Sequence, residues 1–185
     1  MPHSYRIFAD SNYAYFITCT VVDWLPIFAD YDYRLIILDS LAHLREHKRT
    51  QLNAFVIMST HLHAVLWPEE SVYLSDVLRD FKRFTSRTIS KEAMRRGDQH
   101  FLDSFAAARE RNRALEVSQF QVWQEGSHPE AIFTADFARQ KIDYIHSNPV
   151  RASLVATPDD WLYSSARAYL RGEKTYPSTD ILPVW

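Results

Sequence analysis

Two strand-like runs separated by only two residues constrain the fold more than any other feature of this sequence. Residues 52–58 and 61–67 are rich in aliphatic and aromatic side chains, and Ser59-Thr60 joins them. Such a short link is typical of an antiparallel hairpin, although Ser-Thr is not among the favoured turn pairs. Pro68 ends the second run because proline has no backbone N–H to donate to a sheet. An antiparallel sheet is therefore predicted.

The rest of the chain alternates strand and helix patterns. Strand-like segments cover residues 13–22 and 120–123, and helical periodicity covers 33–48, 73–91 and 134–148. Thr134 is expected to cap the last helix and Pro149 to end it. Residues 95–116 are charged and weakly patterned, so we expect a mobile connection there. This order predicts an α+β fold with a ferredoxin-like antiparallel sheet and helices packed on one face, not a doubly wound parallel sheet.

Composition limits the class of protein further. A chain of 185 residues with 46% hydrophobic residues can bury one core, which predicts a single domain over 1–185 with an aromatic C-terminal extension from about residue 150. Three glycines are too few for a Gly-rich phosphate loop or dinucleotide fingerprint, so no nucleotide cofactor is expected. The single cysteine, the lack of a signal-like apolar start and the lack of a long apolar run predict a cytoplasmic protein with no membrane partner.

The charge is unevenly distributed along the chain. The net charge is −2, but residues 79–113 hold ten Lys or Arg and five Asp or Glu. The helix predicted at 73–91 carries a basic stripe with four-residue spacing and one further lysine beside it: Arg79, Arg83, Arg87 and Lys91, with Lys82. Such a segment is compatible with a nucleic-acid-binding patch and with an ordinary solvated helix face. On charge alone, the solvated helix face is favoured.

His61 and His63 form the first candidate site. Residues i and i+2 of a strand point to the same face, so two imidazoles could converge on one cation while Leu62 faces the core. Two solvent-facing histidines on a half-exposed strand are the alternative. Taken alone, the triplet is weak evidence for a metal site.

The helix predicted at 134–148 carries a second candidate group. Its buried stripe consists of Ala138, Ile142 and Ile145. Lys141, Tyr144 and Asn148 share a different face, and an amide oxygen is a ligand that hard cations accept. A partly buried tyrosine followed by an Asn-Pro helix stop would give the same pattern.

Several segments of the sequence resemble those of a known family. His61-Leu62-His63 is similar to the HUH motif of metal-dependent single-strand DNA nickases. Residues 141–152 (KIDYIHSNPVRA) resemble the catalytic-helix signature of the REP-associated tyrosine transposases, and 161–169 (WLYSSARAY) follows at the expected distance. Shorter likenesses lie at 80–86 (DFKRFTS) and 123–128 (WQEGSH). The resemblance extends from about residue 15 to 169, with Ser59-Thr60 in place of the usual Pro-Asn pair.

The resemblance implies an HUH nickase fold and a function. His61, His63 and Asn148 would be ligands of Mg²⁺ or Mn²⁺, and Tyr144 would be the nucleophile. The implied reaction is cleavage and rejoining of single-stranded DNA at hairpin elements through a 5′-phosphotyrosine. The basic stripe would grip phosphates of the hairpin. Relatives act as monomers or homodimers, and the sequence does not choose between them.

Three other functions are compatible with parts of the pattern. Histidine-triad nucleotide hydrolases also carry alternating histidines, but their third histidine would fall at Val65. A non-catalytic, domesticated protein that binds nucleic-acid hairpins would retain the same motifs. A zinc ion that merely staples two strands is a third explanation, and it predicts unfolding when metal is removed.

Overall fold

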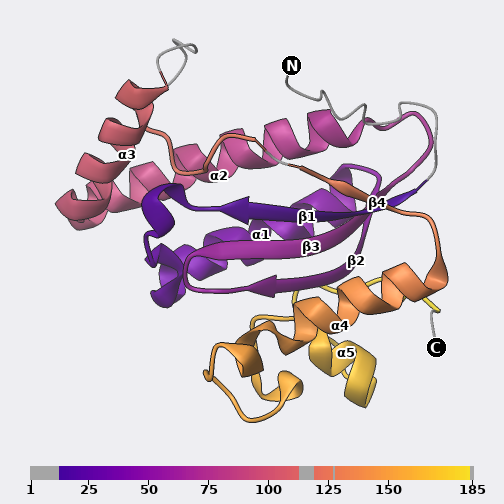
Figure 1. Ribbon diagram of the computed structural model, residues 1–185. Coiled ribbons are helices and arrows are strands. Elements are labelled where there is room, and N and C mark those ends of the chain that lie inside the picture. The colour runs from indigo at the N-terminus through magenta and orange to yellow at the C-terminus, as the bar shows by residue number, and fades with distance from the viewer. Residues whose placement is uncertain (1–12, 113–118, 127, 184–185) are drawn as a thin grey trace.

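A computed structural model describes residues 13–112, 119–126 and 128–183. A four-stranded antiparallel sheet in the order β2-β3-β1-β4 lies at its centre (Figure 1). Its strands are β1 (Ala14–Thr20), β2 (Thr50–Ile57), β3 (His61–Pro68) and β4 (Glu130–Ile132). The α-helices are α1 (Tyr31–His47), α2 (Leu74–Arg96), α3 (Gln99–Arg111), α4 (Ala135–Arg151) and α5 (Ala166–Arg171). Three short 3-10 helices are η1 (Val22–Trp24), η2 (Ile27–Ala29) and η3 (Pro158–Asp160). This topology confirms the α+β class and the ferredoxin-like strand order.

Alternation along the strands gives the sheet two apolar faces. Ile17, Leu62 and Leu66 belong to a core cluster that also contains buried residues of α1, α2 and α3. Phe16 and Val65 belong to a second cluster, formed with the buried stripe of α4. The expectation that the helices pack on one face of the sheet therefore holds for α1 and α2, whereas α4 packs on the opposite face (Figure 1).

The expectation of a mobile connection over 95–116 is wrong for its described part. α2 continues to Arg96 and ends at Gly97, whose φ of 73° is the left-handed conformation common after helices. α3 follows almost at once, because Leu102, Phe105 and Ala108 bury one side of this alanine-rich segment. Residues 113–116 lie outside the described residues.

α4 begins as predicted but ends later. The Thr134 hydroxyl accepts a hydrogen bond from the amide of Phe137, which confirms the predicted cap. The predicted end at Asn148 is wrong, because the helix passes through Pro149 to Arg151. Pro149 lies in the last turn, where its missing N–H removes a single helical bond.

The prediction of a strand at 120–123 is also wrong, because these residues are described and do not form a strand. Trp123 makes only an isolated bridge to Val21. The fourth strand is the three-residue β4, which pairs with β1 between Ala14 and Phe16. Its length leaves too few residues for an alternating pattern, so periodicity could not reveal it.

The C-terminal residues cover the outer edge of β2. The amide of Ile57 donates to the carbonyl of Tyr163 at 2.8 Å, and the amide of Asp180 donates to the carbonyl of Leu52 at 2.9 Å. The Asp180 carboxylate accepts from the Leu52 amide at 3.1 Å and binds Arg45 at 2.6 Å. The aromatic extension thus packs onto the body as expected, although Trp185 lies outside the described residues. None of the described helices is long and apolar enough to cross a membrane.

We expect Asp180→Ala to lower the free energy of unfolding by about 2 kcal/mol, because it leaves a guanidinium and a strand amide without their acceptor. Glu69→Ala is the matched control, since that carboxylate binds Arg49 on an exposed surface and should contribute under about 1 kcal/mol. Urea unfolding of both variants measures the difference. Equal losses would contradict the anchoring of the C-terminal segment at β2.

Candidate metal and nucleophile site

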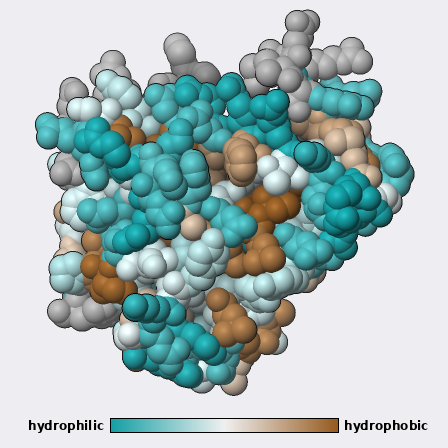
Figure 2. All heavy atoms as spheres, turned by 180° about the vertical axis from the view of Figure 1, so that it is seen from behind, coloured by the Kyte–Doolittle hydropathy of each residue, from teal (hydrophilic) through white to brown (hydrophobic). Residues whose placement is uncertain are grey.

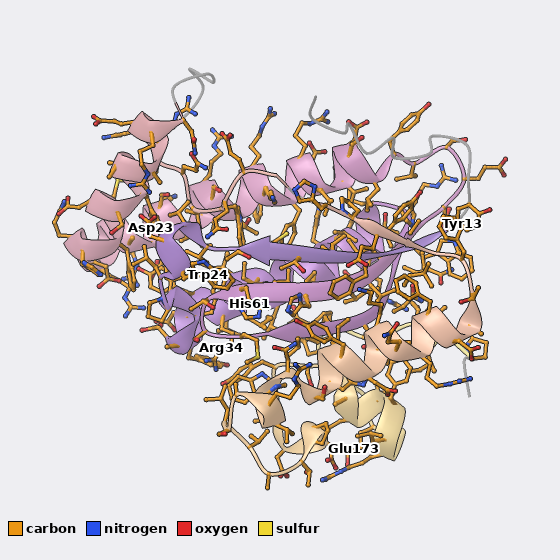
Figure 3. All side chains as sticks on the ribbon, in the orientation of Figure 1. Tyr13, Asp23, Trp24, Arg34, His61 and Glu173 are labelled. Carbon is orange, nitrogen blue, oxygen red and sulfur yellow. The ribbon has the colours of Figure 1, made fainter. Side chains whose placement is uncertain are left out.

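β3 places two imidazoles side by side on the sheet face that α4 covers. The ring centroids of His61 and His63 lie 4.7 Å apart with an interplanar angle of 69°. The His63 ring lies 5.2 Å from the ring of Tyr144 on α4. Figure 3 labels His61 near one end of the sheet, at the start of β3. The predicted histidine pair and the predicted tyrosine are therefore brought together.

In each of the two histidine rings, the Nδ1 atom lies within hydrogen-bond distance of a threonine hydroxyl. Thr18 lies opposite His63 in the β1–β3 register, and its Oγ1 is 2.8 Å from Nδ1 of that ring. Thr60 Oγ1 is 2.9 Å from Nδ1 of His61. A histidine whose Nδ1–H donates to a fixed oxygen presents its Nε2 lone pair to a cation. No local sequence pattern indicates Thr18, because its role depends on which strands become neighbours.

Burial keeps both rings neutral. Burial, together with smaller electrostatic contributions from His61 and Lys141, lowers the pKa of His63 to about 3. Burial also lowers the pKa of His61, while a hydrogen bond with Asn148 opposes that shift. Neutral imidazole is the form that binds a metal ion, so the rings are in the metal-binding state at physiological pH.

α4 presents Tyr144 and Asn148 to the histidines from one side. The Asn148 side chain lies near enough to His61 to raise the pKa of that ring, and the Tyr144 ring lies 5.9 Å from that of Phe16. Tyr144 is 37% exposed, and within the described part of the chain its hydroxyl has no hydrogen-bond partner. The Arg151 guanidinium lies 5.5 Å from the centre of the Tyr144 ring. Sequence reasoning missed Arg151 because it ended the helix three residues too early.

Lys141 occupies the next turn of α4 toward its N-terminus. Its Nζ lies 2.8 Å from a carboxylate oxygen of Glu130 and 4.4 Å from the centre of the Phe16 ring. The side chain is therefore held against β1 and β4 by a carboxylate and an aromatic ring. Its charge lies close enough to His63 to affect that ring's pKa.

The donor set fits a divalent cation. Two neutral imidazole nitrogens and one amide oxygen are acceptable ligands for Zn²⁺, Mn²⁺ or Mg²⁺. Among the described residues, no three His, Cys, Asp or Glu side chains gather into a metal-binding group. A cation at this site would therefore depend on Asn148 as its third protein ligand.

The basic stripe lies on the other side of the sheet. α2 packs on the face opposite α4, so its arginines are not brought to Tyr144. Arg83 and Arg87 line a groove between α1 and α2, together with His43, Lys48 and Phe84. Figure 2 looks onto the side of the molecule where α1 lies, and hydrophilic residues there surround smaller hydrophobic areas.

The five predicted basic residues differ in their surroundings. Arg79 pairs with Asp76 and Asp80 of its own helix. Lys82 Nζ lies 3.4 Å from the carbonyl of Gln124, and Lys91 lines a separate hollow that also contains Asp32 and Glu92. Within the described residues, Arg83 and Arg87 have no carboxylate within ion-pair distance. These two arginines are the best-placed members of the stripe for an external anion.

Comparison with known proteins finds similarity at the level of structure. The sequence matches no protein-family model and no curated protein. A solved structure of a REP-associated tyrosine transposase bound to a REP hairpin aligns with a TM-score of 0.64 at 19% identity, over 98% of this chain and 89% of that chain. This chain has the fold of a REP-associated tyrosine transposase. The resemblance read from the motifs is thereby confirmed at the level of the fold.

We expect Thr18→Val to weaken the binding of Mn²⁺ about tenfold, because the variant loses the oxygen that orients the His63 ring. Thr88→Val is the matched control, since among the described residues the Thr88 hydroxyl binds just the carbonyl of Phe84 in its own helix. Calorimetric titration of both variants with Mn²⁺ measures the change. An unaltered affinity in Thr18→Val would show that the hydroxyl does not orient the ring.

Proposed function

We propose that this chain is a metal-dependent single-stranded DNA nickase and strand transferase that acts at hairpin elements. One observation carries the proposal: α4 delivers Tyr144 to His63 and Asn148 to His61 from a single helical face. A nucleophile and an oxygen ligand thus meet a pair of neutral imidazoles. The fold likeness to a transposase bound to a REP hairpin supports the same substrate class.

Tyr144 would carry the covalent step. Its phenol loses its proton as the oxygen attacks the scissile phosphorus, the bond from phosphorus to the 3′ oxygen breaks, and the leaving oxygen takes up a proton. The products are a 5′-phosphotyrosine and a free 3′-hydroxyl, which can attack the same phosphorus in the reverse sense. Because the phosphodiester energy is kept in the covalent intermediate, rejoining needs no nucleotide cofactor.

His61, His63 and Asn148 would hold Mg²⁺ or Mn²⁺, and Thr18 and Thr60 would fix the orientation of the two rings. When bound, such a cation polarises a phosphoryl oxygen and stabilises the charge that develops on it. The Arg151 guanidinium, above the Tyr144 ring, adds positive charge where a phosphate would approach.

The hairpin stem would be gripped on the opposite side of the sheet, in the groove of α1 and α2. Arg83 and Arg87, which form no ion pair with any described carboxylate, supply positive charge there, and Lys48 lies in the same groove. Stem and cleaved strand would then occupy different faces, so the DNA would have to pass around the sheet. The protein would act in the cytoplasm, where its one cysteine, the buried Cys19, stays reduced.

We expect a covalent protein–DNA adduct when the chain is incubated with labelled single-stranded hairpins and Mn²⁺ or Mg²⁺. Tyr144→Phe should abolish the adduct, because it removes only the attacking oxygen. Tyr31→Phe is the matched control, since that tyrosine is exposed on α1. Denaturing gels detect the adduct. Hairpin binding without any adduct in the unaltered chain would favour a non-catalytic hairpin-binding protein instead.

The basic groove gives a separate prediction for binding. Replacing Arg83 and Arg87 together by alanine should reduce the slope of log affinity against log salt by about 2, since each phosphate contact in a duplex contributes roughly 0.9. Arg95→Ala is the control, because Glu92 already binds that arginine. An unchanged slope in the double variant would make the stripe a solvated helix face.

A further inference from the structure

Trp24 is an exposed aromatic side chain at the border of the candidate site. It is 59% exposed, and its ring packs edge-on against His61 with centroids 5.9 Å apart. His61 in turn contacts His63, and His63 contacts Tyr144. Figure 3 shows Trp24 beside His61, just beyond the end of β1. A continuous series of ring contacts therefore leads from Trp24 to the candidate nucleophile.

The backbone that carries Trp24 is strained and held in place. Asp23 and Trp24 have φ values of 52° and 53°, a left-handed conformation that is unfavourable for residues other than glycine. Arg111 binds both carboxylate oxygens of Asp23 at 2.8 Å. The amide of Val21 donates to the carbonyl of Thr60, which fixes this turn to the β2–β3 hairpin. Such strain persists only where the surrounding contacts impose it, and it is concentrated at functional sites.

A role in the hydrophobic core does not explain why residue 24 is a tryptophan. Its neighbours Val22, Ile27 and Phe28 are buried, whereas the indole points outward from the strained turn. An exposed indole offers a flat apolar face on which a nucleobase can stack. The ion pair with Arg111 also offsets the charge of Asp23, which would otherwise repel an approaching phosphate.

We infer that Trp24 is a stacking platform for an unpaired nucleobase of the strand that enters the site, next to the phosphate that Tyr144 attacks. This inference rests on the proposed function. The ligand is a base of single-stranded DNA, because bases inside a duplex already have both faces covered by their neighbours. Trp24 would thus favour an unpaired strand at the cleavage position, with little preference for base identity.

The test uses the Tyr144→Phe chain, which can bind DNA without cleaving it. The probes are one DNA hairpin, selected for binding from a pool of imperfect palindromes, and the same hairpin with a single-stranded extension. Trp24→Ala should weaken binding of the extended hairpin about tenfold and leave the blunt hairpin unchanged. Trp24→Phe keeps an aromatic face and should stay within about threefold of the parent. With 2-aminopurine placed along the extension, quenching at one position should depend on Trp24.

Two further variants separate stacking from structure. Trp24→Gly removes the indole and relieves the left-handed backbone, so its Tm should equal or exceed that of the parent while binding of the extension falls. Tyr73→Ala removes an aromatic side chain that is 50% exposed before α2, and it should leave both affinities unchanged.

The outcomes distinguish this inference from the proposed function. Equal binding of the extended hairpin by the parent and Trp24→Ala overturns the inference alone. An equal loss of affinity for both hairpins in Trp24→Ala also overturns it, because the side chain would then contribute to binding of the stem or to folding. A chain that binds no hairpin at all overturns the proposed function and this inference together.

Discussion

The antiparallel pairing of β1 with β3 is the interaction on which the site depends. Its register sets Thr18 opposite His63 and so supplies the oxygen that orients that ring. The same alternation sends His61 and His63 toward α4 and Leu62 into the opposite core. A slip of one residue would exchange these faces and bury the imidazoles among aliphatic side chains. Core formation and site formation therefore select the same register.

The position of α4 is the second requirement, and polar contacts add to its apolar packing. His146 Nε2 lies 2.8 Å from the Ser165 hydroxyl, and that hydroxyl accepts a hydrogen bond from the amide of Phe55 in β2. Burial lowers the pKa of His146 to about 4, so the ring stays neutral inside the fold. α4 is thereby linked to β2 through the segment before α5, in addition to the buried contacts of Ile142.

Local patterns predicted those parts of the molecule that local sequence determines. The hairpin, the shared face of His61 and His63, and the cap at Thr134 follow from alternation, periodicity and capping chemistry. β4 was too short to show a pattern, and α3 was obscured by its charged residues. The contacts of Thr18 and Trp24 with the histidines depend on tertiary neighbours that no local window contains. The four-residue spacing likewise assigned Arg79 to the basic stripe of α2. It could not show that Arg79 forms an ion pair with a carboxylate of the same helix.

The covered edge of β2 has a consequence for how copies of this chain can associate. Backbone groups that a second strand would need are already bonded to Tyr163 and Asp180. A sheet shared between two molecules, or the first layer of a fibre, therefore cannot start at β2 unless the C-terminal segment is displaced. A chain shortened before Trp161 would expose this edge and become prone to aggregation, even with its histidine pair intact.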